Sequence, residues 1–389
     1  MEDNLGDTSL LIDYITHPWR QVDDSIRDRL IATCQDVIAS LETPLEAARK
    51  NSFLTLDHAV VRSAIQLNAF ELLASREKPW ATQDLAAATL PPCDVSLLSR
   101  LLRYLASPLR LVVEEGPGLW KVTRRGRAFA DPKLKSVSSF DSCGPIFQAL
   151  PSWVSADSSK RAASPFKSAL PDENSFFDWL QKDNLKLREF HAWMETLTQH
   201  QASSQKSVDL SIWTPEKISD NEVAFVDIAG GNGRQCIEVQ ENRGSVPGRI
   251  VKQDSEEVVQ TTRRQLEEKG IEVMVHNIFD SQPVKGAHVY HFRQVFHEWP
   301  DQDAVKILER TKEAMIASST LLIDEVVLPE QGAHWTVTQS DLTALALFNA
   351  GERSEAQWRA LLTQVGLRVE EIYCYNARTA TCLIVAKLG

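Results

Sequence analysis

The sequence predicts an α/β protein in which a helical N-terminal domain precedes a parallel, doubly wound sheet. Three observations indicate this fold class. Strands alternate with helices from about residue 224 onward, the pattern that builds parallel sheets. A glycine-rich turn at 229–233 directly follows the first of these strands. The first half instead contains helices that end in a short β-hairpin.

Length and charge limit the possible classes. The chain has 389 residues, so we expect two domains, 1–165 and 166–389, joined in a Ser-, Pro- and Ala-rich stretch. The formal charge of −11 disfavours nucleic acid as a partner. No apolar run approaches the roughly 20 residues of a membrane span. The polar start at Met1–Asn4 lacks a secretory signal, so we expect a cytoplasmic protein without membrane association.

The cysteines are scattered and form no CxxC pair. They are Cys34, Cys93, Cys143, Cys236, Cys374 and Cys382. Such spacing favours neither a zinc site nor a disulfide framework. We therefore expect buried, reduced thiols and no metal.

The N-terminal half has the element order of a winged helix. We expect helices at 24–41, within 54–75 and at 96–105, and a short helix that begins after Thr82 as its N-cap. Hairpin strands are expected at 111–115 and 119–123. Arg100 and Arg103 would lie on the recognition helix of a DNA-binding protein, but the acidic charge argues against that function. The apolar stretch Val60–Leu73 indicates a dimerisation surface, so we expect a homodimer.

The second half supplies the sheet. We expect a helical segment at 175–201 and later helices at 255–269 and 303–317. The expected strands are 224–228, 249–253, 271–276, 287–292 and 320–327, with a closing pair at 367–373 and 380–386.

The first strand leads into a candidate cofactor site. It ends at Asp227 and continues into Ala229-Gly230-Gly231-Asn232-Gly233, where glycines allow a ligand to approach the backbone. The next strand ends at Asp254, about twenty residues further on, and a carboxylate there can accept both hydroxyls of a ribose. On these residues alone, a methyl donor and a nicotinamide cofactor are equally compatible.

Three later segments carry a more specific resemblance. They are Arg293-Gln294-Val295-Phe296-His297-Glu298-Trp299-Pro300-Asp301, Leu322-Ile323-Asp324-Glu325-Val326-Val327-Leu328-Pro329 and Asn349-Ala350-Gly351-Glu352-Arg353-Ser354. In this order they resemble motifs of the S-adenosylmethionine-dependent O-methyltransferases of the plant caffeic-acid and fungal secondary-metabolism type. The resemblance runs from about Leu45 to the C-terminus. It implies a Rossmann-like methyltransferase sheet with an N-terminal helical, winged-helix-like dimerisation domain.

The resemblance also implies roles for individual residues. His297 matches the general base, and Glu325 and Glu352 match the two acids beside it. The positions implied for the cofactor are Asp227, Ala229, Gly230, Gly231, Gly233, Asp254, Asn277, Ile278 and Arg293. The positions implied for a small-molecule acceptor are Phe190, Met194, Trp299, Leu345 and Asn349.

The residue types suit methylation of a phenolic or enolic hydroxyl. A phenol has a pKa of about 10, so a base must remove its proton at neutral pH. A histidine oriented by a carboxylate can do so. We expect the Glu325→Gln variant to lose less activity than His297→Ala, because the amide keeps the shape of the carboxylate.

Some positions leave alternatives open. Ala229 and Asn277 depart from the Gly and Asp common in the family, and Lys252 stands where an apolar residue is usual. Fungal members of this family include pericyclases that transfer no methyl group, so this reaction is the alternative function. A non-enzymatic winged-helix regulator is a third. Glu352 could also be a loop acid paired with Arg353, and Phe190 and Met194 could be plain core residues.

Overall fold

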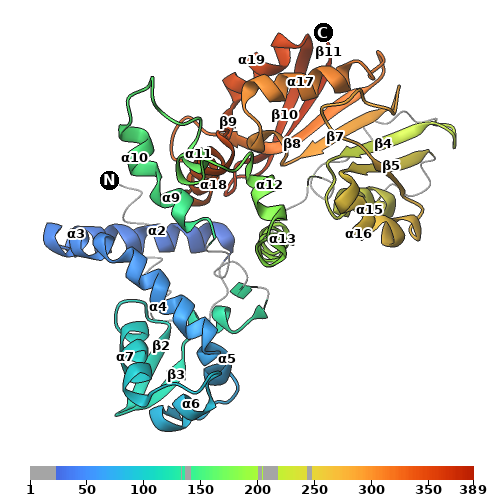
Figure 1. The fold of residues 1–389 in the computed structure, drawn as a ribbon. Helices are drawn as coiled ribbons and strands as arrows, with labels where there is room; N and C mark the ends of the chain where they lie inside the picture. The colour runs from blue at the N-terminus through green and yellow to red at the C-terminus, as the bar shows by residue number, and fades with distance from the viewer. Residues whose placement is uncertain (1–22, 133, 136–141, 200–203, 205–217, 243–247) are drawn as a thin grey trace. The chain divides into compact units, whose positions relative to one another are not determined.

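The computed structural model describes residues 23–132, 134–135, 142–199, 204, 218–242 and 248–389. The chain divides into two compact units, Met1–Ser139 and Phe140–Gly389 (Figure 1). The division falls before the predicted boundary at 165, because Cys143 and Ile146 pack into a cluster with Phe166 and Leu347 of the second unit. The composition of this stretch does not reveal that packing. Two predictions lie outside the described residues: the absence of a secretory signal at residues 1–4 and the end of the predicted 175–201 helix.

The first unit has the predicted winged-helix-like order. Its helices are α2 (Asp24–Leu41), α3 (Pro44–Ser52), α4 (Leu54–Gln66), α5 (Ala69–Ala74), α6 (Thr82–Ala88) and α7 (Val95–Ala106), followed by the 3-10 turn η1 (Gly126–Phe129). Strands β1 (Trp80–Ala81), β2 (Val112–Gly116) and β3 (Leu119–Val122) form an antiparallel sheet in the order β1-β3-β2.

The predicted helical stretch within 54–75 is confirmed as two helices, because Asn68 takes a left-handed conformation with φ 53° and separates α4 from α5. One local prediction in this unit is wrong. Thr82 does not cap α6, whose N-cap position is Ala81. Its hydroxyl instead donates to the Gly118 carbonyl at 3.1 Å and accepts from Trp120 Nε1 at 2.9 Å, which ties the helix to the wing hairpin.

The apolar stretch Val60–Leu73 is core, not surface. Val60, Phe70 and Leu73 are 7%, 0% and 1% exposed, because the hairpin and α7 cover them. These three side chains therefore pack inside their own unit and offer no surface to a partner. Exposed apolar side chains lie earlier, on α2, α3 and the start of α4: Ile31, Val37, Ile38, Leu41, Leu45, Phe53, Leu54 and Leu56.

The second unit is built on one large sheet. Its helices are α9 (Gly144–Gln148), α10 (Leu150–Ser155), α11 (Pro165–Ala169), α12 (Phe176–Gln181), α13 (Asn184–Gln199), α15 (Arg234–Asn242), α16 (Glu256–Glu267), α17 (Asp301–Lys312), α18 (Trp335–Phe348) and α19 (Glu355–Gln364), with the 3-10 turn η3 (Phe296–Glu298). Its strands are β4 (Val223–Ile228), β5 (Arg249–Asp254), β6 (Glu272–Val275), β7 (Val289–Arg293), β8 (Thr320–Leu328), β9 (Arg353–Ser354), β10 (Leu367–Asn376) and β11 (Thr381–Leu388).

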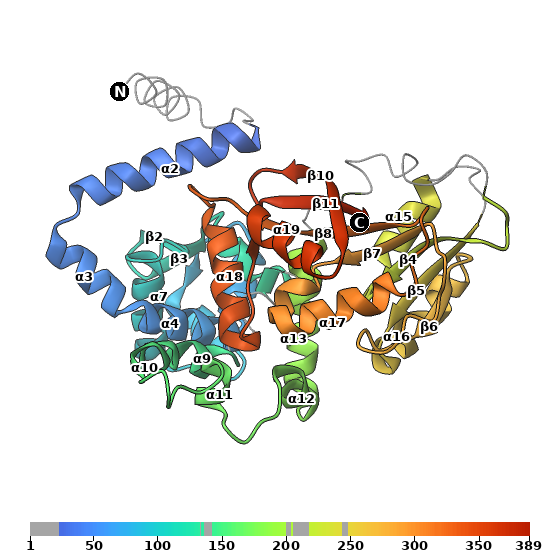
Figure 2. The ribbon, with the colours of Figure 1, turned by 90° about the horizontal axis from the view of Figure 1, so that it is seen from above.

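The strand order explains where the site lies. The order is β10-β11-β8-β7-β4-β5-β6, with β9 beside β8, and Figure 2 shows β7, β4, β5 and β6 following one another. Strands β4 to β8 pair in parallel, whereas β10 and β11 pair antiparallel, as predicted for the closing strands. The carboxyl ends of β5, β4, β7 and β8 therefore share one edge of the sheet, where open α/β sheets bind ligands.

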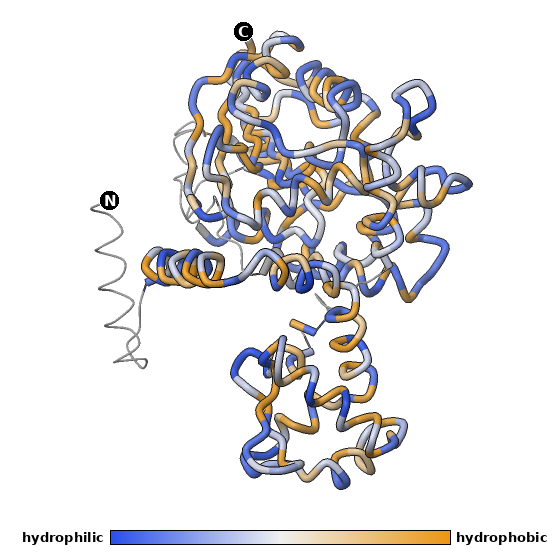
Figure 3. Tube along the Cα trace, turned by 90° about the vertical axis from the view of Figure 1, so that its left-hand side faces the viewer, coloured by the Kyte–Doolittle hydropathy of each residue, from blue (hydrophilic) through white to orange (hydrophobic). Residues whose placement is uncertain are grey.

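Helices cover both faces of this sheet. Residues of α17 and α19 pack against one face in a cluster with Val226, whereas residues of α15 and α16 pack against the other with Phe225. Neighbouring strand residues point to opposite faces, so apolar runs such as 223–228 are buried on both sides. Figure 3 shows hydrophobic stretches of the trace running through the interior of the larger unit.

The cysteines differ from the prediction. Cys374 and Cys382 form a disulfide, because they occupy directly paired positions on the antiparallel strands β10 and β11. Sequence spacing alone does not reveal that register. Cys34 is exposed, whereas Cys143 and Cys236 are buried free thiols, as expected. Among the described residues, no helix is long and apolar enough to cross a membrane.

Candidate functional site

The turn after β4 has an open concave backbone. Ala229, Gly231 and Gly233 have positive φ angles of 55°, 56° and 77°, which bend the chain sharply into α15. No heavy atom of the described residues lies within 4 Å of a Cβ placed at Gly231, so this position faces open space in that part of the chain. A Cβ at Gly230 would instead lie 2.5 Å from Asp227 Oδ2. The turn therefore has one face available to a ligand and one face packed against Asp227.

The carboxylate of Asp227 is turned into the protein. The residue is fully buried, and its Oδ1 lies 2.8 Å from His291 Nδ1. Cys236 Sγ, 3.7 Å away, is directed at the other oxygen. Asp227 thus supports the glycine turn from beneath, and its side chain is occupied by partners from β7 and α15.

The carboxylate of Asp254 lies at the open side of the same turn. Its Oδ2 accepts a hydrogen bond from the Gly231 N–H at 2.8 Å, and its Oδ1 accepts one from the Ser255 N–H at 2.8 Å. Lys252 Nζ lies 3.5 Å from Oδ2 and is fully buried. Burial lowers the pKa of Lys252, and the charge of Asp254 opposes this effect. The sequence marked Lys252 only as unusual and did not connect it to Asp254.

Asn277 and Ile278 follow β6 at the same edge. The backbone N–H of His276 donates to the Asp254 carbonyl at 2.9 Å, which places this loop beside the end of β5. Asn277 is exposed, and its Oδ1 accepts from the Phe279 N–H at 3.1 Å. An open glycine turn, a carboxylate and an exposed amide thus lie along one edge of the sheet, where open α/β sheets bind ligands.

His297 lies on η3, just beyond the end of β7, and is held by Glu325 of β8. His297 Nδ1 lies 3.1 Å from Glu325 Oε2. The other oxygen of Glu325 accepts from the backbone N–H groups of Val295 and Phe296, at 2.6 and 2.7 Å. Glu325 is fully buried, so these three contacts replace the water that a charged carboxylate requires.

Glu352 completes the group from a loop between α18 and β9. One ligand atom from each of His297, Glu325 and Glu352 lies within 4.8 Å of the others. Glu352 Oε1 accepts from Ser340 Oγ at 2.7 Å, and its backbone N–H donates to Asp341 Oδ1 at 2.9 Å. The sequence did not identify Ser340 and Asp341, because their only signal was that they are polar residues within a helix.

The alternative pairing of Glu352 with Arg353 is not the contact that this structure shows. The Arg353 guanidinium lies 2.8 Å from Asp301 and donates to the carbonyls of Phe296 and Trp299, each at 2.8 Å. Arg353 therefore fixes the backbone on both sides of His297.

The charges around His297 change its protonation. Burial disfavours the imidazolium, but the carboxylates of Glu325, Glu352 and Glu298 outweigh this effect and raise the pKa of His297 to about 10. Burial, partly offset by His297, raises the pKa values of Glu298 and Glu352 to about 7. The group can thus hold and redistribute protons near neutral pH, which is the property that general acid–base chemistry requires.

Arg293, at the end of β7, is held by Asp324. Its Nη1 donates to Asp324 Oδ2 at 2.9 Å. Ser204 Oγ donates to the same oxygen at 2.7 Å, and the Tyr375 hydroxyl donates to Oδ1 at 2.6 Å. The family resemblance implied Arg293 as a cofactor residue, but it did not indicate Asp324 or the two other donors to Asp324.

The predicted acceptor residues fall into two packing groups. Phe190 and Met194 of α13 belong to a cluster that includes Leu347 of α18, and Phe190 is 8% exposed. Leu345 is half-buried on α18, and Asn349 ends that helix with φ 58°. Trp299 packs edge-on against Phe279 in the sheet cluster instead.

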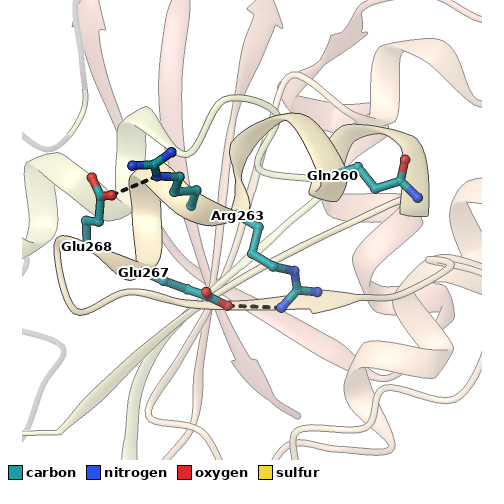
Figure 4. Close-up of a pocket in the computed structure, with 5 residues that line it drawn as sticks. Gln260, Arg263, Glu267 and Glu268 are labelled. Carbon is teal, nitrogen blue, oxygen red and sulfur yellow. Dashed lines mark hydrogen bonds and ion pairs between the residues drawn. The ribbon is translucent and has the colours of Figure 1, made fainter.

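A surface recess on α16 contains none of these residues. It is lined by Gln260, Arg263, Arg264, Glu267 and Glu268 (Figure 4). Its charged side chains form two ion pairs along one exposed helix, Arg263–Glu267 and Arg264–Glu268, each 3.0 Å long. Such pairs are ordinary features of a solvated helix surface.

Comparison with known families decides the class of protein. The family model of the O-methyltransferase domain matches residues 175–368, and the family model of the O-methyltransferase dimerisation domain matches residues 52–132. O-methyltransferase apf6 of Gibberella fujikuroi is 53% identical over 84% of this chain and 93% of its own length. This chain belongs to the O-methyltransferase family. The predicted family, fold class and S-adenosylmethionine-dependent methyltransferase activity are thereby confirmed.

A second relative has a solved structure. O-methyltransferase lepI of Aspergillus flavus is 30% identical over 90% of this chain and 91% of its own length. The structure of LepI in complex with SAM has a TM-score of 0.86 and 28% identity, and it covers 100% of this chain and 99% of the LepI chain. A structure described as a pericyclic reaction enzyme matches with the same score and identity, covering 100% of each chain.

Proposed function

We propose that this methyltransferase methylates a phenolic or enolic hydroxyl of a small secondary metabolite, with His297 as the general base. The observation that carries the proposal is the His297–Glu325 pair, with Nδ1 and Oε2 3.1 Å apart, at the sheet edge that also bears the glycine turn. Glu325 accepts a hydrogen bond from the Nδ1–H of His297, which leaves Nε2 to take the proton of the acceptor. Glu352 adds a second negative charge that stabilises the imidazolium.

The donor would lie along the sheet edge beside β4 and β5. Bound S-adenosylmethionine supplies a methyl group already activated by its sulfonium. The Gly230–Gly231 backbone would approach the donor, Asp254 would accept the ribose hydroxyls, and Asn277 with Ile278 would contact the adenine. Asp227 would act indirectly, because its buried carboxylate supports the turn.

The acceptor would contact the apolar side chains near α13 and α18. Phe190, Met194 and Leu345 offer flat or flexible apolar surface, and Trp299 and Asn349 flank the base and the end of α18. The main task of this surface is alignment, because transfer requires the oxygen, methyl and sulfur in line. Apolar contacts around a single base suit an aromatic or polycyclic acceptor.

The test is a product assay with labelled methyl donor and a panel of phenols and enols. We expect a product heavier by one methyl group, together with one equivalent of S-adenosylhomocysteine. The alternative function is a pericyclic reaction, which is supported by the similarity to the pericyclic reaction enzyme. Turnover to a product of unchanged mass, with the donor intact, would replace methylation by that alternative.

We also propose a homodimer built on the apolar face of α2. Ile31, Val37, Ile38 and Leu41 are 46%, 45%, 53% and 77% exposed and recur at helical spacing with the exposed Cys34. The face continues into α3 and α4, where the dimerisation-domain match begins at residue 52. We expect a second copy of the chain to cover this face. Two α2 helices packed antiparallel would bury both apolar faces, with Cys34 near the middle of the contact.

Light scattering and crosslinking test this interface. We expect a dimer at micromolar concentration. Mild oxidation should link its two Cys34 residues by a disulfide, and the Cys34→Ser variant should not form this linked species. Ile38→Asp should give monomers, whereas Glu77→Gln, at the exposed turn after α5, should not. A dimer unaffected by Ile38→Asp would contradict this interface.

A cytoplasmic location remains our proposal from the sequence. The free cysteines Cys93, Cys143 and Cys236 support it, whereas the Cys374–Cys382 disulfide is more common in oxidising compartments. Fractionation of cells that express a tagged chain would test it. Recovery in a secreted or membrane fraction would contradict it.

A further inference from the structure

Glu352 lies on a loop, unlike the other acid of the catalytic group. Glu325 belongs to β8, and its Oε1 is held by two backbone N–H groups. Glu352 instead lies between the end of α18 at Phe348 and the start of β9 at Arg353, and it is 7% exposed. A buried carboxylate in such a segment is costly and poorly oriented unless neighbouring elements hold it.

Two consecutive residues of α18 hold Glu352. Asn349 ends the helix in a left-handed conformation with φ 58°, and the loop then returns to the middle of the same helix. There the Ser340 hydroxyl donates to Glu352 Oε1 at 2.7 Å, and Asp341 Oδ1 accepts from the Glu352 N–H at 2.9 Å. One contact therefore orients the side chain, and the other fixes the backbone that carries it.

The glycine before Glu352 permits this close approach. A Cβ at Gly351 would lie 2.7 Å from Asp341 Oδ1, the atom that accepts from the Glu352 N–H. The φ angle of Gly351 is not positive, so the backbone conformation does not require glycine there. A side chain at this position would instead push the Asp341 carboxylate away from the loop. The need for glycine is thus explained by the contact with α18.

The other end of the loop is fixed to the turn that carries His297. Arg353, the next residue after Glu352, donates to the carbonyls of Phe296 and Trp299 on either side of that histidine. Helix α18 also packs against this turn, η3. The loop is therefore anchored at both ends, and the contacts on α18 decide where the Glu352 carboxylate lies relative to the imidazole.

The contact with Ser340 also affects the charge of Glu352. Burial raises the pKa of Glu352 to about 7, whereas the charge of His297 and the hydrogen bond from Ser340 lower it. A hydroxyl that donates to a carboxylate stabilises its ionised form. Ser340 thus favours the form of Glu352 that can stabilise an imidazolium.

We infer that Ser340 and Asp341 are positioning residues that hold the Glu352 carboxylate against His297. This inference rests on the proposed function, in which His297 is the general base, and it adds the helix that places the second acid. Each of the two residues acts through Glu352. Loss of either contact should therefore slow methyl transfer without weakening the binding of the donor.

Steady-state kinetics of hydroxyl variants test the role of Ser340. We expect Ser340→Ala to lower kcat by about threefold to tenfold, because Glu352 loses a hydrogen bond to its charged form. The KM of the donor should change less than about twofold, and Ser340→Thr, which keeps the hydroxyl, should retain kcat within about twofold. Thr338→Ala is the matched control. Thr338 is an exposed residue of the same helix whose hydroxyl donates to the Trp335 carbonyl, and its loss should leave kcat unchanged.

A double-mutant cycle shows whether Ser340 acts through Glu352. In a Glu352→Ala enzyme no carboxylate remains for Ser340 to hold, so adding Ser340→Ala should lower kcat no further. A normal kcat for Ser340→Ala, or losses that simply add in the double variant, would overturn the inference.

Variants at Asp341 cover the case in which the Ser340 variants do not fold. Asp341→Asn keeps an oxygen that can accept from the Glu352 N–H and should retain most of the activity. Asp341→Ala and Gly351→Ala both remove this contact, so they should lower kcat while the donor KM stays unchanged. Equal activity of Asp341→Ala and Asp341→Asn would overturn the inference and leave the proposed function intact. An unmodified protein that transfers no methyl group would overturn the proposed function, and this inference with it.

Discussion

Nδ1 of His297 lies 3.1 Å from Oε2 of Glu325, while the other oxygen of Glu325 accepts two backbone N–H groups, from Val295 and Phe296. Glu325 therefore has a fixed orientation. Its Oε1 accepts hydrogen bonds from two backbone N–H groups, and its Oε2 accepts one from the Nδ1–H of His297. This arrangement sets the tautomer of His297 before any acceptor binds.

His297→Ala should lower kcat by about 10²–10⁴-fold, because no base would then remove the proton from the substrate hydroxyl. The calorimetric affinity for S-adenosylhomocysteine should change little, since the contacts that we propose for the donor lie at the ends of β4 and β5. His58→Ala is the control, an exposed histidine of α4 in the other unit, and it should leave both quantities unchanged. A His297→Ala enzyme of normal kcat would contradict the assignment of the base.

Glu325→Gln should lose nearly as much activity as His297→Ala, contrary to the expectation from sequence alone. The amide oxygen must face the N–H groups of Val295 and Phe296, so the amide NH₂ must face His297 Nδ1. Nδ1 then becomes an acceptor and the proton moves to Nε2, which can no longer act as a base. Steady-state kinetics decide the point. A loss below about tenfold would show that the carboxylate only fills space.

The acceptor kcat/KM should rise from neutral to alkaline pH. The carboxylates around His297 raise its pKa to about 10, and only the neutral imidazole can accept a proton. Glu352→Gln removes one of these charges, so the rise should move to lower pH. A pH–rate profile of both enzymes is the measurement. A shift to higher pH would contradict the electrostatic role of Glu352.

Glu352→Gln should also change the pH dependence of stability. Burial raises the pKa of Glu352 from 4.5 to about 7, so the stability contributed by its protonated form is complete below pH 4.5 and is lost as pH rises through 7. Gln does not ionise. The variant should therefore exceed the wild-type free energy of unfolding by roughly 1–3 kcal/mol near pH 8 but not near pH 4.5.

Urea unfolding at the two pH values measures this difference. The exposed Glu355→Gln, on α19, is the control and should show no such pH dependence. An equal effect of Glu352→Gln at both pH values would indicate that burial of its charge is not the cause.

Adjacent glycines should respond differently to alanine. A methyl group at Gly230 would lie 2.5 Å from Asp227 Oδ2, so Gly230→Ala should displace a buried acid and lower the melting temperature. A methyl group at Gly231 meets open space, so Gly231→Ala should cost only about 1–2 kcal/mol for its positive φ. Gly231→Ala should nevertheless bind S-adenosylhomocysteine poorly, because the methyl group would occupy open space beside the turn that the proposed donor site requires. Normal binding by this folded variant would place the donor elsewhere.

Much of the fold and part of the site were accessible from sequence. The alternation of strands and helices from β4 onward depends on local periodicity, which the chain carries residue by residue. The glycine turn, Asp254 and His297 were predictable because each follows directly on a strand end, and parallel strands bring their carboxyl ends to one edge.

The amino-acid sequence by itself determined the elements, their alternation and the residue types at the strand ends. Only the tertiary structure decided which side chains meet. Ser204 lies 120 residues before Asp324, and Tyr375 lies 51 residues after it, yet all three are in contact. Likewise, the pairing of β10 with β11 joins Cys374 to Cys382, and packing against α5 and α7 buries Val60 of α4. Periodicity shows that a face is apolar or polar, but its partner depends on strand order and register, which no local pattern contains.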